Sequence, residues 1–131
     1  KRGVDVRVLL PGPKTDHPGV RFAAWRYYKQ LLHHGVRLYE YQPRFIHAKI
    51  ILVDDWVSIG SCNLAHWNQR WNLEANQEVL DARFAQRVRG FFEACFPESE
   101  EQDLRAWFRP LWYRRLLAYV WGRVDAWLMR L

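Results

Sequence analysis

The residues best suited to chemistry stand at the two ends of one apolar segment, "HAKIILVDDWVSIGSCN". His47 and Lys49 begin it, and Gly60, Ser61 and Asn63 end it. An imidazole can attack phosphorus or move a proton, while an ammonium and an amide can stabilise charge on phosphate oxygens. Gly60 would let a substrate oxyanion or another backbone come close. Together these groups suit phosphoryl chemistry, which needs no metal here.

The apolar run between these ends is typical of two strands joined by a turn at Asp54 and Asp55. Residues two apart on a strand share a face, so His47 and Lys49 are expected to point the same way. The return strand must bring its own polar groups to that face. The length of the turn therefore decides whether the polar side chains meet.

A two-residue turn would pair His47 with the residue before Asn63 and leave Asn63 on the opposite face. A three-residue turn, extended through Trp56, would pair Lys49 with Ser61 and His47 with Asn63. We predict the longer turn, because it places all four polar side chains on one face.

The rest of the chain must position this hairpin. Hydrophobic periodicity and turn residues predict strands at residues 4–10, 36–41, 46–53, 56–60 and 73–80, a helix at 18–34 that ends at Gly35, and a helix capped by Asp81 that presents Phe84, Val88, Phe91 and Cys95 on one face. This order predicts an α/β fold, with a mixed β-sheet flanked by helices. We assign residues 1–96 to this domain.

The remaining residues, 97–131, form a helical tail rich in Arg and Trp, in which Pro110 separates two helices. One interpretation is an amphipathic helix in the membrane interface, with Arg114, Arg115, Trp121 and Trp127 as its membrane-binding residues. The other is that its apolar stripe packs on a part of the protein outside this chain. The sequence favours neither.

Composition narrows the classes of function. The chain has 131 residues, half of them hydrophobic, which suffices for one domain with an ordinary core. Its net charge of +6 favours an anionic partner such as nucleic acid, anionic lipid or a phosphate-bearing substrate. The two cysteines have no metal-type spacing and are expected to be buried thiols in a reducing compartment. No run of about 18 apolar residues would span a bilayer, and the start inside a strand suggests a piece of a longer protein.

The pattern H-x-K, then D, then G-S-x-N, from His47 to Asn63, resembles the HKD motif of the phospholipase D superfamily, with one residue fewer than usual between the Asp and the Gly-Ser. The stretches "RGVDVRVLLPG", "DHPGV", "LLHHGVRLYEYQPRFIHAK" and "DDWVSIGSCNLAHWNQRWNLEANQEV" resemble the carboxy-terminal catalytic half of bacterial cardiolipin synthases. The resemblance covers roughly residues 3 to 96. It implies one half of the phospholipase D-like fold.

The resemblance also implies roles. His47 would protonate the leaving alcohol and later deprotonate the incoming one, while a histidine of a second motif forms a phosphohistidine. Lys49 and Asn63 would hold the phosphate oxygens. Glu74 matches the acidic residue that hydrogen-bonds a catalytic histidine and sets its tautomer. The supporting residues would be Asp54, Gly60 and Ser61.

The implied enzyme is a phosphatidyltransferase that makes cardiolipin from phosphatidylglycerol, with phosphatidylglycerol or phosphatidylethanolamine as donor and without cofactor or metal. Because this chain carries one motif, it is expected to need a missing amino-terminal half or a homodimer partner, and to be inactive alone unless dimeric. The implied location is the cytoplasmic face of a bacterial inner membrane, as a peripheral protein on an anionic surface. Alternatives are a phospholipase D or nuclease-type phosphodiesterase, although the Trp content makes nucleic acid a poor fit, and a noncatalytic membrane-binding module.

Overall fold

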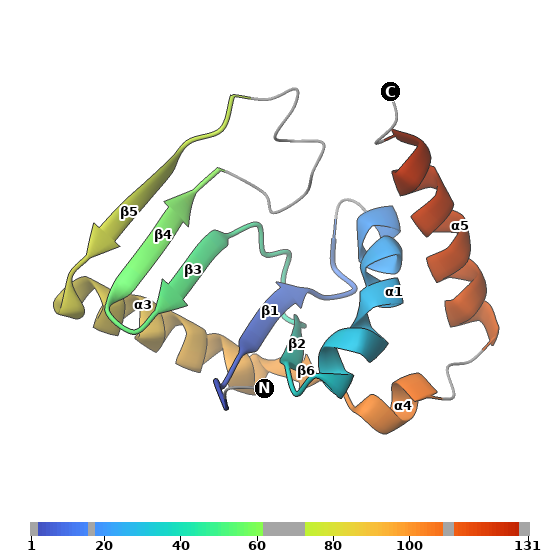
Figure 1. The fold of residues 1–131 in the computed structure, drawn as a ribbon, viewed down its shortest axis with the longest axis horizontal. Helices are drawn as coiled ribbons and strands as arrows, with labels where there is room; N and C mark the ends of the chain where they lie inside the picture. The colour runs from blue at the N-terminus through green and yellow to red at the C-terminus, as the bar shows by residue number, and fades with distance from the viewer. Residues whose placement is uncertain (1–2, 16–17, 62–72, 109–111, 129–131) are drawn as a thin grey trace. The chain divides into compact units, whose positions relative to one another are not determined.

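The computed structural model describes residues 3–15, 18–61, 73–108 and 112–128, which are drawn in colour in Figure 1. The chain divides into two compact units, residues 1–46 with 96–131, and residues 47–95. Each unit contains one three-stranded sheet and at least one helix packed on it. The predicted α/β class is therefore confirmed. The single sheet that the sequence suggested is instead two sheets, because residues 42–48 between the second and third strands are irregular and pair with neither.

The first unit comprises β1 (Arg7–Pro11), α1 (Pro18–His33), β2 (Arg37–Tyr41), a 3₁₀ turn η1 (Phe96–Glu98), β6 (Ser99–Glu101), α4 (Leu104–Phe108) and α5 (Trp112–Leu128). Its sheet is mixed, since β1 pairs with β2 in parallel and β2 pairs with β6 antiparallel. The helix α1 is the crossover that a parallel pair requires. The helix ends at His33, and Gly35, the C′ residue that the sequence predicts, follows it with a left-handed φ of 83°.

The core of this unit lies between β2 and the helices. Leu38 is fully buried and packs with Trp25, Tyr28 and Trp107. The ring of Trp107 lies 5.7 Å from that of Trp25 and 4.9 Å from that of Tyr28, both at steep angles that aromatic pairs favour. Because Trp107 comes from α4, the tail contributes to the core of this unit.

A buried carboxylate lies beside that core. Glu40, only 1% exposed, accepts hydrogen bonds from Arg21 Nη2 at 2.6 Å, Tyr28 Oη at 2.9 Å and Trp25 Nε1 at 3.3 Å. Burial, and then the nearby Glu40 carboxylate, raise the pKa of the Tyr28 hydroxyl well above its ordinary value. The hydroxyl therefore stays protonated and keeps donating to the carboxylate. This network links α1 to β2. Its hydrogen bonds replace the water that these buried polar groups lose on folding.

The second unit comprises β3 (Lys49–Val53), β4 (Trp56–Gly60), β5 (Asn76–Leu80) and α3 (Ala82–Cys95). The three strands form an antiparallel meander, and α3 covers one face of it (Figure 1). The predicted cap is present, since the Phe84 amide donates to Asp81 Oδ1 at 2.7 Å. The core contains Val57, Ala85 and Val88, with Phe92 packed against it. Of the four residues that the sequence places on one face of α3, Phe91 is 40% exposed.

The tail forms two helices, as predicted, on either side of residues 109–111. It belongs to the first unit, where α5 lies along α1 (Figure 1). The expected division into a catalytic domain of residues 1–96 and a tail of residues 97–131 stays a prediction about function. In packing, the tail joins the first unit. In the described ranges, no helix combines the length and hydropathy that crossing a bilayer requires.

Candidate active site

The hairpin that carries the motif has a two-residue turn. Lys49 pairs with Gly60 and Val53 pairs with Trp56, which leaves only Asp54 and Asp55 in the turn. The three-residue turn predicted from the sequence was therefore wrong. With this register Lys49 faces Gly60 rather than Ser61.

The backbone at Asp54 explains the shorter turn. Asp54 has a φ of 51°, a left-handed conformation that Asp tolerates better than most residues. Two-residue turns with positive φ match the right-handed twist of the paired strands, so they are the common hairpin connection. The Asp54 carbonyl also accepts a hydrogen bond from Arg89 Nη2 at 3.2 Å, which ties the turn to α3. Asp54 thus lies at the opposite end of the hairpin from Lys49.

His47 and Lys49 lie at the other end. His47 is exposed and precedes β3 in an irregular segment, so the expectation that it sits within the strand was wrong. Lys49 is the first residue of β3, is half-buried, and places its Nζ 3.5 Å from the His47 carbonyl oxygen. An imidazole and an ammonium are therefore presented at one end of one strand.

Gly60 and Ser61 end the return strand beside β5. A side chain at Gly60 would collide with the Ala75 carbonyl and with Asn76. Ser61 is bonded to Ala75 in both directions, since its amide donates to the Ala75 carbonyl at 3.0 Å and its Oγ accepts from the Ala75 amide at 3.1 Å. Glu74, which is half-buried, directly precedes this clamped residue. The close approach that Gly60 permits is therefore to backbone.

Two residues that the sequence analysis did not single out share the sheet face of Lys49. Asn76 pairs with Gly60, and its Nδ2 lies 3.3 Å from the Oγ of Ser58. Ser58 is 4% exposed. The strand register, which places Ser58, Gly60 and Asn76 on one face, is the signal that could have identified them. Their hydrogen bond fixes the Asn76 side chain beside the end of β4 that carries Gly60 of the motif.

Replacing Gly60 by alanine is expected to destabilise the chain by about 1–3 kcal/mol, because the added methyl group must displace the β5 backbone. Urea denaturation followed by circular dichroism measures the change. Gly90→Ala is the matched control: a methyl group there meets nothing within 4 Å, and the helical position favours alanine by about 0.5–1 kcal/mol. Equal effects at both positions would contradict the close packing of β4 and β5.

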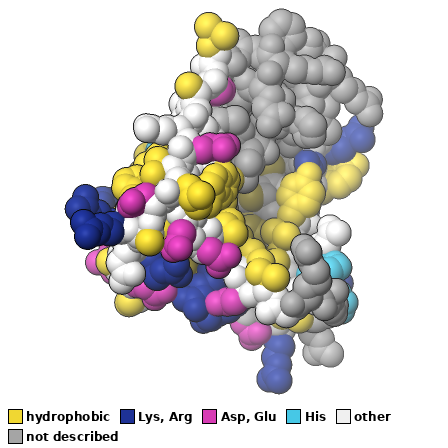
Figure 2. Space-filling model, turned by 60° about the vertical axis from the view of Figure 1, so that its left-hand side comes forward, with side chains coloured by type: hydrophobic (Ala, Val, Ile, Leu, Met, Phe, Trp, Pro, Cys, Tyr) yellow, Lys and Arg dark blue, Asp and Glu magenta, His cyan; other side chains and the backbone are white. Residues whose placement is uncertain are grey.

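The face of this sheet opposite α3 is partly apolar. Ile51, Val53 and Leu80 point to that face and are 37%, 54% and 81% exposed. Figure 2 brings the left-hand side of Figure 1 forward and shows hydrophobic side chains interspersed with acidic and basic ones. In the part of the chain that the structure describes, no group of three or more His, Cys, Asp or Glu side chains could hold a metal ion.

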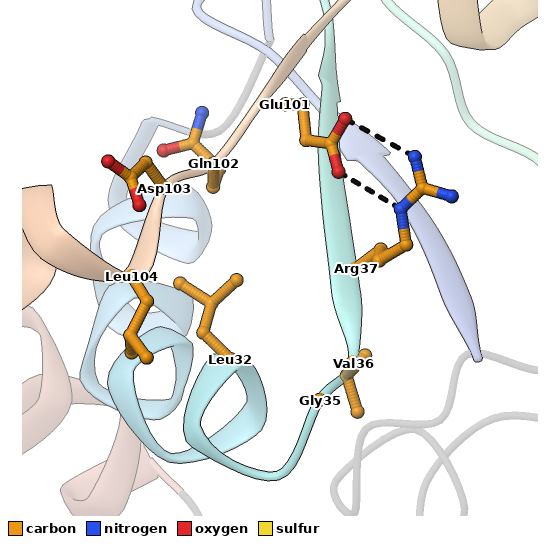
Figure 3. A pocket seen from close by; sticks show the side chains of 8 residues that line it. All are labelled: Leu32, Gly35, Val36, Arg37, Glu101, Gln102, Asp103 and Leu104. Carbon is orange, nitrogen blue, oxygen red and sulfur yellow. Dashed lines mark hydrogen bonds and ion pairs between the residues drawn. The ribbon is translucent and has the colours of Figure 1, made fainter. Parts of the chain in front are cut away.

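A shallow pocket of about 380 Å³ lies in the first unit, between the end of α1, β2 and the segment from β6 to α4 (Figure 3). Its polar feature is an ion pair in which Arg37 Nε donates to Glu101 at 3.0 Å. That hydrogen bond lowers the pKa of Glu101, so the pair stays charged. None of the predicted catalytic residues lines the pocket. We therefore do not place the active site there.

The remaining predicted site residues are only partly placed. Asn63 lies outside the described residues, so its position relative to Lys49 remains a prediction. Nothing is described of the side chains of Arg114, Arg115 and Trp127. Trp121 is 38% exposed and rests its ring against Gly19 of α1. The catalytic and membrane-binding roles of all these residues stay predictions.

Comparison with known proteins supplies independent information. Residues 1–96 match a family model described as "Cardiolipin synthase, PLD-like domain". The chain is 42% identical, over 101 residues and 76% of its length, to cardiolipin synthase A from Pseudomonas aeruginosa (strain LESB58). It shows the same identity and coverage with cardiolipin synthase A from Pseudomonas entomophila (strain L48) and from Pseudomonas putida (strain ATCC 47054). The matched region is 20% or 21% of those proteins, so the chain spans about a fifth of their length. No solved structure matches the chain.

Proposed function

Because the chain belongs to the family of cardiolipin synthase phospholipase D-like domains, we propose that it supplies one catalytic half of a phosphatidyltransferase that makes cardiolipin. The observation that carries this proposal is that His47 and Lys49 lie two residues apart at one end of β3, where the lysine Nζ is 3.5 Å from the backbone carbonyl oxygen of His47. A histidine and a lysine at the same end of a strand suit transfer of a charged phosphoryl group.

In the proposed reaction, a histidine from a second motif attacks the phosphorus of a phospholipid. The bond between phosphorus and the leaving alcohol breaks as His47 gives its proton to that alcohol oxygen. His47 then removes a proton from the hydroxyl of phosphatidylglycerol. The freed oxygen attacks phosphorus, the phosphorus–nitrogen bond breaks, and the first histidine is regenerated.

The other residues of the motif would stabilise this chemistry. Lys49 and Asn63 would neutralise charge on the non-bridging phosphate oxygens. Glu74 would hold a catalytic histidine in one tautomer, as an acidic partner does in other histidine-dependent sites. Ser61 would keep Glu74 in place, because it clamps the neighbouring Ala75 through the backbone amide at 3.1 Å.

The second histidine must come from elsewhere, either an amino-terminal half of the same protein or a second copy of this chain. We propose that the chain alone has no activity unless it dimerises. We further propose that it works at the cytoplasmic face of a bacterial inner membrane, where phosphatidylglycerol and phosphatidylethanolamine are both accessible as donors.

The test is to supply the full-length protein with phosphatidylglycerol vesicles, with and without phosphatidylethanolamine, and to identify the products by mass spectrometry. Cardiolipin is the expected product, and its increase with phosphatidylethanolamine would identify that lipid as the donor. Phosphatidic acid as the only product would show that the protein is a hydrolase rather than a transferase. Cleavage of single-stranded DNA without any lipid product would assign the site to nucleic acid instead.

A further inference from the structure

The helix α5 uses one face to pack on α1. Leu117 and Ala118 pack against the core of the first unit, and Gly122 is buried. The Gly122 carbonyl accepts a hydrogen bond from Arg26 Nη1 at 3.1 Å, which fixes α5 against α1. This face is therefore already covered within the chain.

A second stripe on α5 is apolar and uncovered in the described structure. Trp112, Leu116, Tyr119 and Val120 are 75%, 52%, 68% and 45% exposed. Leu116 lies four residues from both Trp112 and Val120 and three from Tyr119, which places all four along one side of the helix. Large apolar side chains gathered in this way are typical of an interaction surface rather than of a solvated helix. Trp and Tyr in particular favour the headgroup region of a bilayer, because they combine an apolar ring with a hydrogen-bonding group.

The charge of the tail identifies the kind of partner. Residues 104–131 contain six arginines and one acidic residue, a net charge of +5 out of the +6 of the whole chain. Arg123, one turn beyond Val120, is exposed. A protein partner would have to neutralise these arginines with its own acids, whereas an anionic bilayer neutralises them with lipid phosphates. The positive charge and the apolar stripe together thus fit an anionic bilayer as the partner.

We infer that the stripe formed by Trp112, Leu116, Tyr119 and Val120 contacts the surface of an anionic phospholipid bilayer, with α5 parallel to the membrane plane. This stripe leaves out Trp121, one of the four membrane-binding residues expected from the sequence, because its ring already rests against Gly19. The inference concerns binding alone and does not depend on the proposed transfer reaction.

The test is co-sedimentation of the 131-residue chain with vesicles of phosphatidylcholine alone, or of equal parts phosphatidylcholine and phosphatidylglycerol. We expect binding to the anionic vesicles at low salt and weaker binding at high salt, because salt screens the attraction between the arginines and the lipid phosphates. The triple substitution Trp112→Ser, Leu116→Ser, Tyr119→Ser is expected to lower the partition coefficient at least about tenfold, since these side chains would leave the bilayer.

The matched control is the triple substitution Val4→Ser, Val53→Ser, Leu80→Ser, which removes three exposed apolar side chains outside α5 and should leave binding unchanged. Trp112→Ser alone, at the most exposed position of the stripe, gives a milder variant should the triple substitution alter the circular dichroism spectrum. Unchanged vesicle binding by these folded stripe variants would overturn the inference. A stripe substitution that abolished self-association seen by sedimentation velocity, but not vesicle binding, would assign the stripe to a protein partner and overturn it equally.

Discussion

Alanine in place of His47 is expected to lower cardiolipin formation by the full-length protein by about 10⁴-fold or more, because general acid–base catalysis alone contributes about 10²–10⁴-fold and both chemical steps use this imidazole. The fold should survive, since His47 is exposed and precedes β3 in an irregular segment. Initial rates with phosphatidylglycerol vesicles, read by mass spectrometry of the product, measure the loss.

His33→Ala provides the matched control, because His33 is another exposed histidine, at the end of α1, with no role in the proposed chemistry. It should retain the rate of the unsubstituted protein. Both variants should show the same thermal unfolding, so that any difference in rate reports on chemistry. A His47→Ala protein that kept more than a tenth of the original rate would remove His47 from the acid–base role.

Alanine in place of Glu40 is expected to reduce the free energy of unfolding by about 3–5 kcal/mol, the usual cost of removing one partner from a buried ion pair. The substitution would leave the Arg21 guanidinium, whose Nη2 lies 2.6 Å from the carboxylate, without its counter-ion. The Tyr28 hydroxyl, 2.9 Å from the carboxylate, would also lose its acceptor in the core. Since whole domains are stable by about 5–15 kcal/mol, this one change removes a large share.

Urea denaturation of the 131-residue chain, followed by circular dichroism, measures this effect. Glu101→Ala is the control: Glu101 pairs with Arg37 at 3.0 Å, but both side chains are about half exposed, and exposed pairs contribute about 0–1 kcal/mol. Tyr28→Phe should be intermediate, at about 1 kcal/mol, because it removes one hydrogen bond and leaves the ion pair. A Glu40→Ala variant no less stable than Glu101→Ala would show that the buried network contributes little.

Local patterns determined much of this fold and of its candidate site. The apolar spacing of α1 and its Gly35 terminus, the Asp81 cap of α3 and the position of the hairpin all depend on residues within a few positions of each other. Such interactions act at short range, so sequence alone reveals them. The motif from His47 to Asn63 likewise identified the family, because its residue types and spacing are specific to one chemistry.

Only the tertiary structure decided the register of the hairpin. The two-residue and three-residue turns shift the pairing of the two strands by one residue. The alternation of side chains along each strand is compatible with both pairings. The choice depends on how the left-handed backbone of Asp54 matches the twist of β3 and β4 and on the contact of its carbonyl with Arg89 of α3. That contact joins residues 35 positions apart, beyond the reach of any local pattern.

The tertiary structure also decided which charged and aromatic residues are buried. The alternation of β2 predicts a strand but not the burial of Glu40, which depends on hydrogen-bond donors 12 to 19 residues earlier in the chain. The tail sequence predicts an amphipathic helix, yet which of its faces packs inward is set by close contacts with Gly19 and Arg26 of α1. Sequence by itself therefore predicted most helices and strands and the residue types of the motif, but not β6 (Ser99–Glu101) in the tail. Tertiary packing, which depends on distant partners, decided register, burial and the exposed face of α5.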